Sequence, residues 1–365
     1  DRGDSPPIVS DSIDGVYFAT FWGIPGHDRS RDPLDQAGST LRNEFLVDIP
    51  GGHKVDVDGI YLNGDWAINE DLTLYFNAGR REQESRLPSS YGGTSGPVSL
   101  FDATRDDDRD TTQFEVRIAS NSDSALNWVA GAYYQSDDTV FCVMQIVGML
   151  DGFGLGTPPG FFNNFPQLLC NTQDAEAKAL YADGTWAVND RFRITAGIRY
   201  SDEEKDWAGR SRMPTAGNGG PLWLTVIDEP IEGADFNRFP QDVQTDSDSW
   251  SEPTYRLILD YDFTEDLMGF IGYSRGFKSG GYNDQTGTLL NPIPPAGLRP
   301  VFPEIADSFE GGIKSTFADG RASIMVNAYY VEYSDAQRTI NASFTDPDTG
   351  LLIGQETLFF NAAEM

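Results

Sequence analysis

The stretch Tyr273-Ser-Arg-Gly-Phe-Lys-Ser-Gly-Gly-Tyr-Asn283 belongs to a series of short segments in which apolar and polar residues alternate. Leu72–Gly79 shows the same alternation earlier in the chain, and Phe309–Phe317 shows it later. A period of two is typical of a β-strand with one apolar and one wet face. The connections between these segments are alternately very short and very long. This inequality indicates that the two ends of the strands lie in different surroundings, which favours a transmembrane β-barrel.

The short connections join the alternating segments into five pairs of predicted antiparallel strands. Each connection is two to four polar or small residues long, and the Asp319-Gly320 dipeptide is a strong signal of a tight turn. The segment Leu267–Asn283 follows one of these turns, but its two faces cannot be assigned from the pattern. The predicted turns are Asn69–Asp71, Asn121–Ser124, Asn189–Asp190, Thr264–Asp266 and Ala318–Gly320.

The long connections are rich in Gly, Pro and Asp. Unstructured segments of this length are uncommon in compact soluble domains, whereas outer-membrane barrels carry long loops outside and short turns on the periplasmic side. We therefore predict outer loops over Gly23–Gly52, Leu87–Asp108, Thr139–Gln173, Trp207–Thr245, Asp284–Phe302 and Asn341–Gln355.

The alternation predicts which side chains face lipid and which face the lumen. Apolar members of each strand would face lipid, and tryptophans near the turns fit an interfacial girdle. The alternative is a soluble β-sandwich or propeller in which the same aromatic residues form an ordinary core. In the barrel, the charged members of the strands line a wet lumen: Arg81, Glu115, Arg117, Asp183, Arg193, Arg199, Arg256, Asp260, Glu310 and Lys314.

The net charge of -31 excludes nucleic acid as a partner, because nucleic-acid binding needs a basic surface. The acidity indicates either a large solvated surface or loops that collect divalent cations. No cofactor is expected, with one weak exception. Asp106, Asp107 and Asp108 lie in a predicted outer loop and are candidate calcium ligands, although their spacing does not match an EF-hand.

Four segments resemble the TonB-dependent outer-membrane receptors. They are Gly272–Asn283, Pro303–Lys314, Val326–Gln337 and Asn361–Glu364. The resemblance implies an all-β, antiparallel, up-and-down transmembrane barrel, of which about 12 of the family's 22 strands are present. Residues 1–365 are then expected to be a fragment of one barrel domain, without the plug domain and the TonB box of complete family members.

The resemblance also implies the function, which is energised uptake of a scarce nutrient across the outer membrane of a Gram-negative bacterium. A ferric siderophore is the expected ligand, with oligosaccharide or cobalamin as alternatives. The expected partners are outer-membrane lipid and lipopolysaccharide, a small-molecule ligand, and the TonB system through parts absent from this chain. Two other classes remain open: a surface scaffold that does not transport, and a secreted glycan-binding β-protein.

No enzyme activity is expected, because the only histidines are His27 and His53 and no nucleophile elbow accompanies them. Arg275 and Lys278 are candidate contacts for the plug, lipopolysaccharide phosphate or an anionic ligand; alternatively, they support packing where the strand bends. The aromatic residues Trp207, Trp223, Trp250 and Tyr91 are either sugar-stacking platforms or loop anchors.

Cys142 and Cys170 bound a predicted loop that carries Phe161, Phe162 and other apolar residues. A disulfide would fit an oxidising compartment and would stabilise by roughly 3–4 kcal/mol; two free thiols are the alternative. The loop either folds over the barrel mouth, where it contacts ligand, or packs as a local mini-core.

Overall fold

The computed structural model describes residues 54–90, 102–146, 166–212, 243–283, 300–345 and 352–362. No helix in these ranges is long and apolar enough to cross a membrane. The described part consists of twelve strands. They are β1 (Lys54–Ala67), β2 (Leu72–Ser90), β3 (Asp102–Ser120), β4 (Leu126–Ile146), β5 (Pro166–Asn189), β6 (Phe192–Arg212), β7 (Gln244–Thr264), β8 (Leu267–Lys278), β9 (Glu304–Phe317), β10 (Ala322–Ser334), β11 (Gln337–Thr345) and β12 (Leu352–Asn361).

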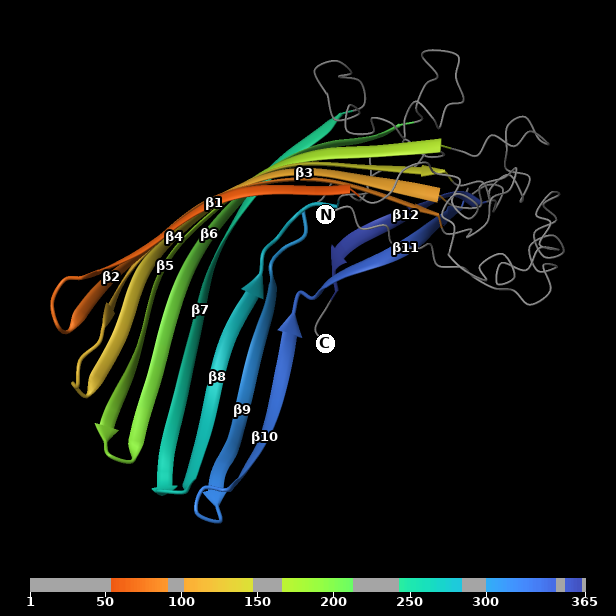
Figure 1. Cartoon of the computed structure of the whole chain (residues 1–365). Helices are drawn as coiled ribbons and strands as arrows, with labels where there is room; N and C mark the ends of the chain where they lie inside the picture. The colour runs from red at the N-terminus through yellow and green to blue at the C-terminus, as the bar shows by residue number, and fades with distance from the viewer. Residues whose placement is uncertain are drawn as a thin grey trace, which may run out of the picture.

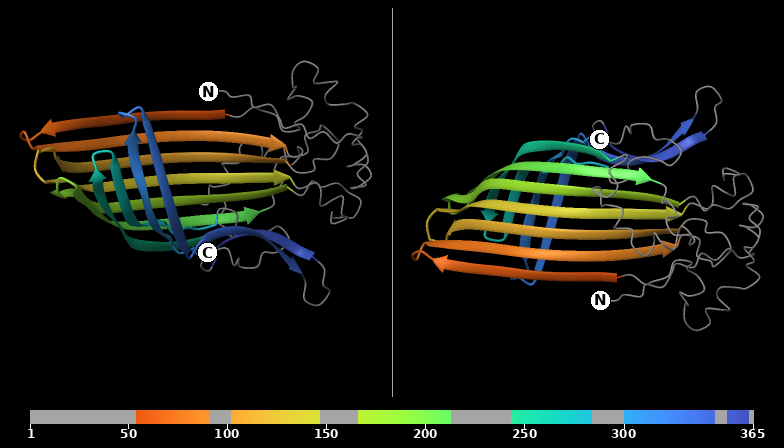
Figure 2. Two further views of the ribbon diagram at one scale, coloured as in Figure 1. Left: turned by 90° about the horizontal axis from the view of Figure 1, so that it is seen from below. Right: turned by 90° about the horizontal axis from the view of Figure 1, so that it is seen from above.

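The first ten strands form a single antiparallel sheet in the order of the chain, and β11 pairs with β12 in a separate two-stranded sheet. The large sheet curls into a trough (Figures 1 and 2). Its edge strands, β1 and β10, have no second neighbour among the described strands. The predicted up-and-down topology is therefore confirmed, and the barrel is partial.

All five predicted short turns are confirmed, and they lie at one end of the sheet (Figure 1). Asparagine side chains fix two of them. The Asn69 Oδ1 accepts hydrogen bonds from the backbone N–H groups of Asp71 and Leu72, each at 2.9 Å. Asn189 makes the same arrangement after β5. In the last turn, Asp319 and Gly320 adopt positive φ angles of 54° and 77°, which suits residues that tolerate the left-handed conformation.

The strand register places the apolar residues of neighbouring strands on the same face. One row, for example, runs Ala196, Leu257, Tyr273, Phe309 and Tyr330 from β6 to β10. The apolar positions of β7 extend from Phe263 to Tyr255, which is roughly 26 Å of strand and matches the apolar band of outer-membrane barrels.

These apolar side chains are exposed rather than packed in a core. Leu180 is 67% exposed and Ile271 is 61% exposed. One buried apolar cluster among the described residues consists of Trp207, Trp250 and Tyr282, and it lies above the apolar band. A soluble sandwich or propeller would bury the alternating residues, so the structure rules out that alternative and supports hydrocarbon as their surroundings.

The strands are longer than the alternation predicts. β5 has 24 residues, and β4, β6 and β7 have 21 each. Parts of the predicted loops Leu87–Asp108, Thr139–Gln173, Trp207–Thr245 and Asn341–Gln355 therefore belong to strands, and those boundaries were wrong. Beyond the apolar band neither face of the sheet has to match hydrocarbon, so the side chains lose their alternation while the backbone ladder continues.

Candidate functional site

The polar face of the sheet lies opposite the apolar band. Register places all ten predicted lumen residues on this face, which confirms that prediction. Several of them line a groove of about 490 Å³ across β3 to β8, within the height of the apolar band. The charged and hydroxyl side chains in the groove include Glu115, Arg117, Tyr181, Asp183, Arg199 and Arg256.

Hydrogen bonds satisfy most charges in the groove. Arg256 on β7 donates from Nε and Nη2 to the carboxylate of Asp183 on β5, at 2.7 and 3.0 Å. Glu115 on β3 accepts from the Tyr181 hydroxyl at 2.7 Å and from Asn77 at 3.0 Å. These contacts join strands β2, β3, β5 and β7 and hold the side chains in fixed positions against the wall.

Arg199 lies in the same groove with different partners. Its Nε donates to the Ser201 Oγ at 3.1 Å. Its guanidinium carbon lies 5.2 Å from the centre of the Tyr133 ring and 5.9 Å from that of Tyr181. The arrangement is a cation–π contact, which favours a charged guanidinium at this position. All three of these partners are neutral side chains.

Arg275, a predicted contact residue, lies on the outward face near the top of the apolar band. It forms a two-pronged ion pair with Asp307, at 2.8 Å from Nε and 2.7 Å from Nη2. The Tyr273 hydroxyl donates to the same carboxylate at 2.6 Å, and the Tyr255 ring lies under the guanidinium at 5.6 Å. The pairing neutralises both charges where the strands leave hydrocarbon, and the place of Arg275 fits the membrane interface rather than the lumen.

Lys278, the other predicted cation of this segment, ends β8. Its Nζ lies 5.6 Å from the ring centre of Phe359 on β12. It therefore links the large sheet to the β11–β12 hairpin. No ligand contact of Arg275 or Lys278 is tested by the geometry, and both roles stay predictions.

The segment after Lys278 is anchored against the inward wall above the apolar band. Lys205 donates from Nζ to the carbonyl oxygen of Gly280 at 2.6 Å. The rings of Trp207 and Tyr282 stack with 5.8 Å between centroids, and Trp250 lies directly beside Gly280. Burial lowers the pKa of Lys205 and raises the pKa of the Tyr282 hydroxyl.

Trp207 and Trp250 are 4% and 7% exposed, so both are anchors of this segment. Their buried faces cannot stack on a sugar ring. The other candidate contacts, Tyr91, Phe161, Phe162 and Trp223, lie outside the residues whose side chains the structure describes.

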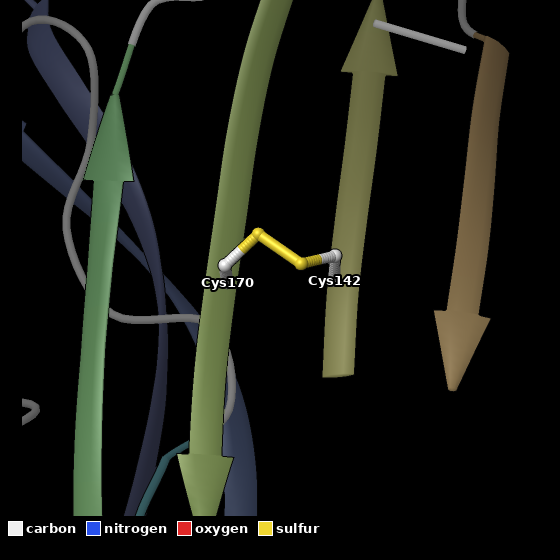
Figure 3. Close-up of a disulfide and its surroundings, with 2 residues drawn as sticks. All are labelled: Cys142 and Cys170. Atoms are coloured by element: carbon white, nitrogen blue, oxygen red, sulfur yellow. A yellow bond between two sulfur atoms is a disulfide. The ribbon is translucent and has the colours of Figure 1, made fainter. Parts of the chain in front are cut away.

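Cys142 and Cys170 are joined by a disulfide (Figure 3). They lie directly opposite each other on β4 and β5, so the prediction that both belong to a loop was wrong. The bond ties two strand extensions together beyond the apolar band.

The acidic candidates Asp106, Asp107 and Asp108 lie in strand β3, so their predicted place in a loop was also wrong. Successive side chains of a strand point to opposite faces, which separates Asp107 from the other two. Within the described ranges, no group of three or more His, Cys, Asp or Glu residues is placed to hold a metal ion. Calcium in the outer loops stays a prediction.

A different acidic arrangement emerges from the register. Six carboxylates, one on each strand from β1 to β6, are directly paired across the outward face above the apolar band. We call them the acidic ladder: Asp58, Glu82, Asp110, Asp138, Asp174 and Asp206. Arg80 compensates two of them, Glu82 at 2.8 Å and Asp110 at 2.5 Å.

Sequence reasoning missed the aromatic partners in these arrangements, namely Tyr133, Tyr181 and Tyr282, together with Lys205. The first two lie on the polar face of their strands, beside the apolar residues that carried the prediction. The register shifts between Ala187 and Asn189 beside the turn, so counting back from the predicted turn would not have placed Tyr181 opposite Arg199. Nothing in the sequence pairs Tyr282 with Trp207, because a long connection separates them.

Comparisons with known proteins agree with this architecture. A protein-family model described as "TonB dependent receptor-like, beta-barrel" matches residues 6–365. No protein in a comparison with curated sequences matches the chain.

Three similar solved structures are the ferric yersiniabactin uptake receptor FyuA of Yersinia pestis, the siderophore receptor PiuA of Acinetobacter baumannii and the ferric-catecholate import receptor Fiu of E. coli K12. Their TM-scores are 0.57, 0.56 and 0.52, at identities of 18%, 14% and 14%. The matches cover 78%, 88% and 91% of this chain but only 37%, 44% and 46% of those proteins. The chain thus spans less than half of their length, and at these identities the likeness shows the fold alone.

Proposed function

The chain belongs to the TonB-dependent receptor family, and from that premise we propose that it forms part of the wall of a receptor for active nutrient uptake. The family is one of receptors and transporters in the outer membrane of Gram-negative bacteria. The observation that carries the proposal is the two-faced wall. Its outer face is an exposed apolar band, and its inner face carries a groove lined by charged, hydrogen-bonded side chains, as expected of a wet lumen.

Uptake of this kind needs an external source of energy, because the outer membrane has no ATP supply. The energy would come from the inner membrane through TonB, acting on a plug domain and a TonB box. We expect these parts outside residues 1–365. The described wall contributes a hydrogen-bonded surface: strands β4 to β7 pair over most of their length, and side chains such as Arg256 and Asp183 cross-link strands two apart.

We propose a ferric siderophore as the nutrient. The three similar structures are a ferric yersiniabactin uptake receptor, a siderophore receptor and a ferric-catecholate import receptor, which supports this choice. An oligosaccharide is less well supported, because Trp207 and Trp250 are buried and offer no stacking surface.

The test is uptake by a strain in which the complete gene is deleted. Iron-limited cells receive radiolabelled iron as siderophore chelates, with and without a protonophore. We expect the deletion to abolish uptake of at least one chelate, the gene on a plasmid to restore it, and the protonophore to block it. If the deletion strain takes up iron normally but fails to grow on an oligosaccharide, the nutrient is an oligosaccharide rather than a ferric siderophore. Normal uptake of both would point to a scaffold.

A further inference from the structure

The inward groove carries an excess of positive charge in a strongly acidic chain. The whole protein has a net charge of -31. On the inward face of the groove, three arginines stand against two carboxylates: Arg117, Arg199 and Arg256 against Glu115 and Asp183. A local excess of positive charge between low-dielectric walls attracts anions and raises their local concentration.

Most of these charges already have partners within the wall. Arg256 and Asp183 form a two-pronged pair. Glu115 accepts from Tyr181 and Asn77, and Arg117 lies 3.8 Å from Glu115 while its guanidinium covers the Tyr75 ring at 5.1 Å. The excess charge therefore resides on Arg199.

Arg199 has no carboxylate within ion-pair distance in the described part of the chain. A guanidinium carries five N–H donors, and here one of them is used, by Ser201. Glu252 on the inward face of β7 lies opposite Ser201, but no ion pair joins it to Arg199 in the described residues. Along its own strand the nearest inward carboxylate is Glu203, four residues or roughly 13 Å away. Another inward carboxylate, Asp137, already accepts from Thr111 at 2.5 Å and from Gln135.

We propose that Arg199, Tyr133 and Tyr181 form a subsite in the wall for a carboxylate group of a small organic ligand. The two rings hold the guanidinium in place without neutralising it, at 5.2 and 5.9 Å. The free N–H groups form a planar fork, which matches the two oxygens of a carboxylate. The groove, at about 490 Å³, has room for a small molecule.

The subsite deepens the proposed function, on which its role in transport rests, because it selects for ligands that carry carboxylates. A cation would be repelled by Arg199, and a neutral sugar would gain no charge-assisted hydrogen bond. Binding itself can be measured without transport.

The test uses the complete receptor purified in detergent, with radiolabelled tricarballylate as a tricarboxylate probe and sucrose as a neutral probe in equilibrium dialysis. Arg199→Gln removes the fork, and Arg199→Lys keeps the charge but loses the planar fork. Arg81→Gln is the matched control. Arg81 is also inward and bonded to a neutral residue, Gln83, but it lies outside the groove.

We expect the wild type and Arg81→Gln to bind tricarballylate alike, and Arg199→Gln to bind it about tenfold more weakly. Arg199→Lys should fall between them, and it keeps the test informative if Arg199→Gln does not fold. Sucrose should not bind. Absence of binding to the wild type, equal binding by the wild type and Arg199→Gln, or an equal loss in Arg81→Gln would overturn the proposal.

The two proposals fail in different experiments. If tricarballylate binds through Arg199 while the deletion strain takes up every nutrient normally, the uptake function fails and the subsite stands. If deletion abolishes uptake while Arg199→Gln binds the probe as the wild type does, the subsite fails and the uptake function stands.

Discussion

Strand β7 contains two regions with the same backbone and opposite side-chain chemistry. Between Phe263 and Tyr255 its outward residues are large and apolar, whereas between Pro253 and Gln244 they are three serines and a threonine. Both regions pair with β6 in one unbroken register. The comparison shows that the ladder of backbone hydrogen bonds does not depend on the solvent. The side-chain pattern does depend on it, because only the lower region separates hydrocarbon from a wet lumen.

The two regions of β7 should differ most in how much stability they lose when a charge is placed on the outward face. Leu257→Arg puts a cation into the apolar band, and we expect it to lower the free energy of unfolding by about 2–4 kcal/mol. Ser249→Arg on the same face of the same strand lies above the band and should change it by less than about 0.5 kcal/mol. Urea unfolding of the complete receptor in lipid vesicles measures both. Equal effects would mean that the outward face does not meet lipid.

The disulfide tests the stability of the upper region alone. Replacing Cys142 and Cys170 with serine removes a cross-link between residues 28 apart in sequence, and we expect a loss of about 3–4 kcal/mol in the free energy of unfolding. Hydrogen exchange should quicken in the upper parts of β4 and β5 and stay unchanged in their lower parts. The wild type treated with a reductant should behave like the double variant. Uniform quickening along both strands would show that the two regions unfold together.

The strand regions inside the apolar band were more predictable from the sequence than the regions above it. The five short turns and the lipid-facing residues were predictable, because hydrocarbon requires an apolar residue at every second position, as in Leu257 and Leu259. The upper parts of the strands were not predictable, because a strand that leaves hydrocarbon can carry polar or apolar residues at any position. Asp106 to Asp108 resemble a loop in sequence yet pair with β2 and β4.

The candidate site was predicted only in part, for a related reason. Alternation placed Arg199 and Glu115 in the lumen, but it gives no information on which inward residues meet across strands. That requires the register, which places Tyr181 opposite Arg199 and sets Arg275 against Asp307. The anchoring of Tyr282 on Trp207 depends on tertiary packing over a long connection, which no local pattern encodes.

Gly276 and Gly280, which lie on either side of the end of β8, test the anchoring of the chain against Trp250. A methyl group added at Gly280 would overlap the Trp250 ring and approach the Val301 carbonyl oxygen to 2.6 Å, whereas one added at Gly276 would meet nothing within 4 Å. Gly280→Ala should therefore lower the free energy of unfolding by about 1–3 kcal/mol and expose Trp250. Gly276→Ala should leave both unchanged. Thermal unfolding followed by tryptophan fluorescence separates the two variants. If both unfold alike, the packing of Gly280 against Trp250 does not stabilise the protein.

The smallest expected effect comes from the acidic ladder. Burial and the neighbouring charges of Asp138 and Asp206 raise the pKa of Asp174. Because the folded state then binds a proton more tightly than the unfolded state, the repulsion is fully present above the folded pKa and is relieved as the pH falls through it. Asp174→Asn should stabilise the receptor at neutral pH by about 0.5 kcal/mol, and the wild type should approach the variant on acidification.

Asp202→Asn is the matched control for this prediction. The carboxylate of Asp202 accepts a hydrogen bond from Ser251 at 2.6 Å, which an asparagine amide oxygen can also accept, so this variant should not gain stability at neutral pH. Urea unfolding from neutral to mildly acidic pH measures both variants. If Asp174→Asn is destabilising at neutral pH, a favourable interaction of Asp174 outweighs the repulsion along the ladder. The outward side chains of the upper strands would then stabilise the sheet together with backbone pairing. The upper and lower regions would differ less in how much their outward side chains contribute to stability.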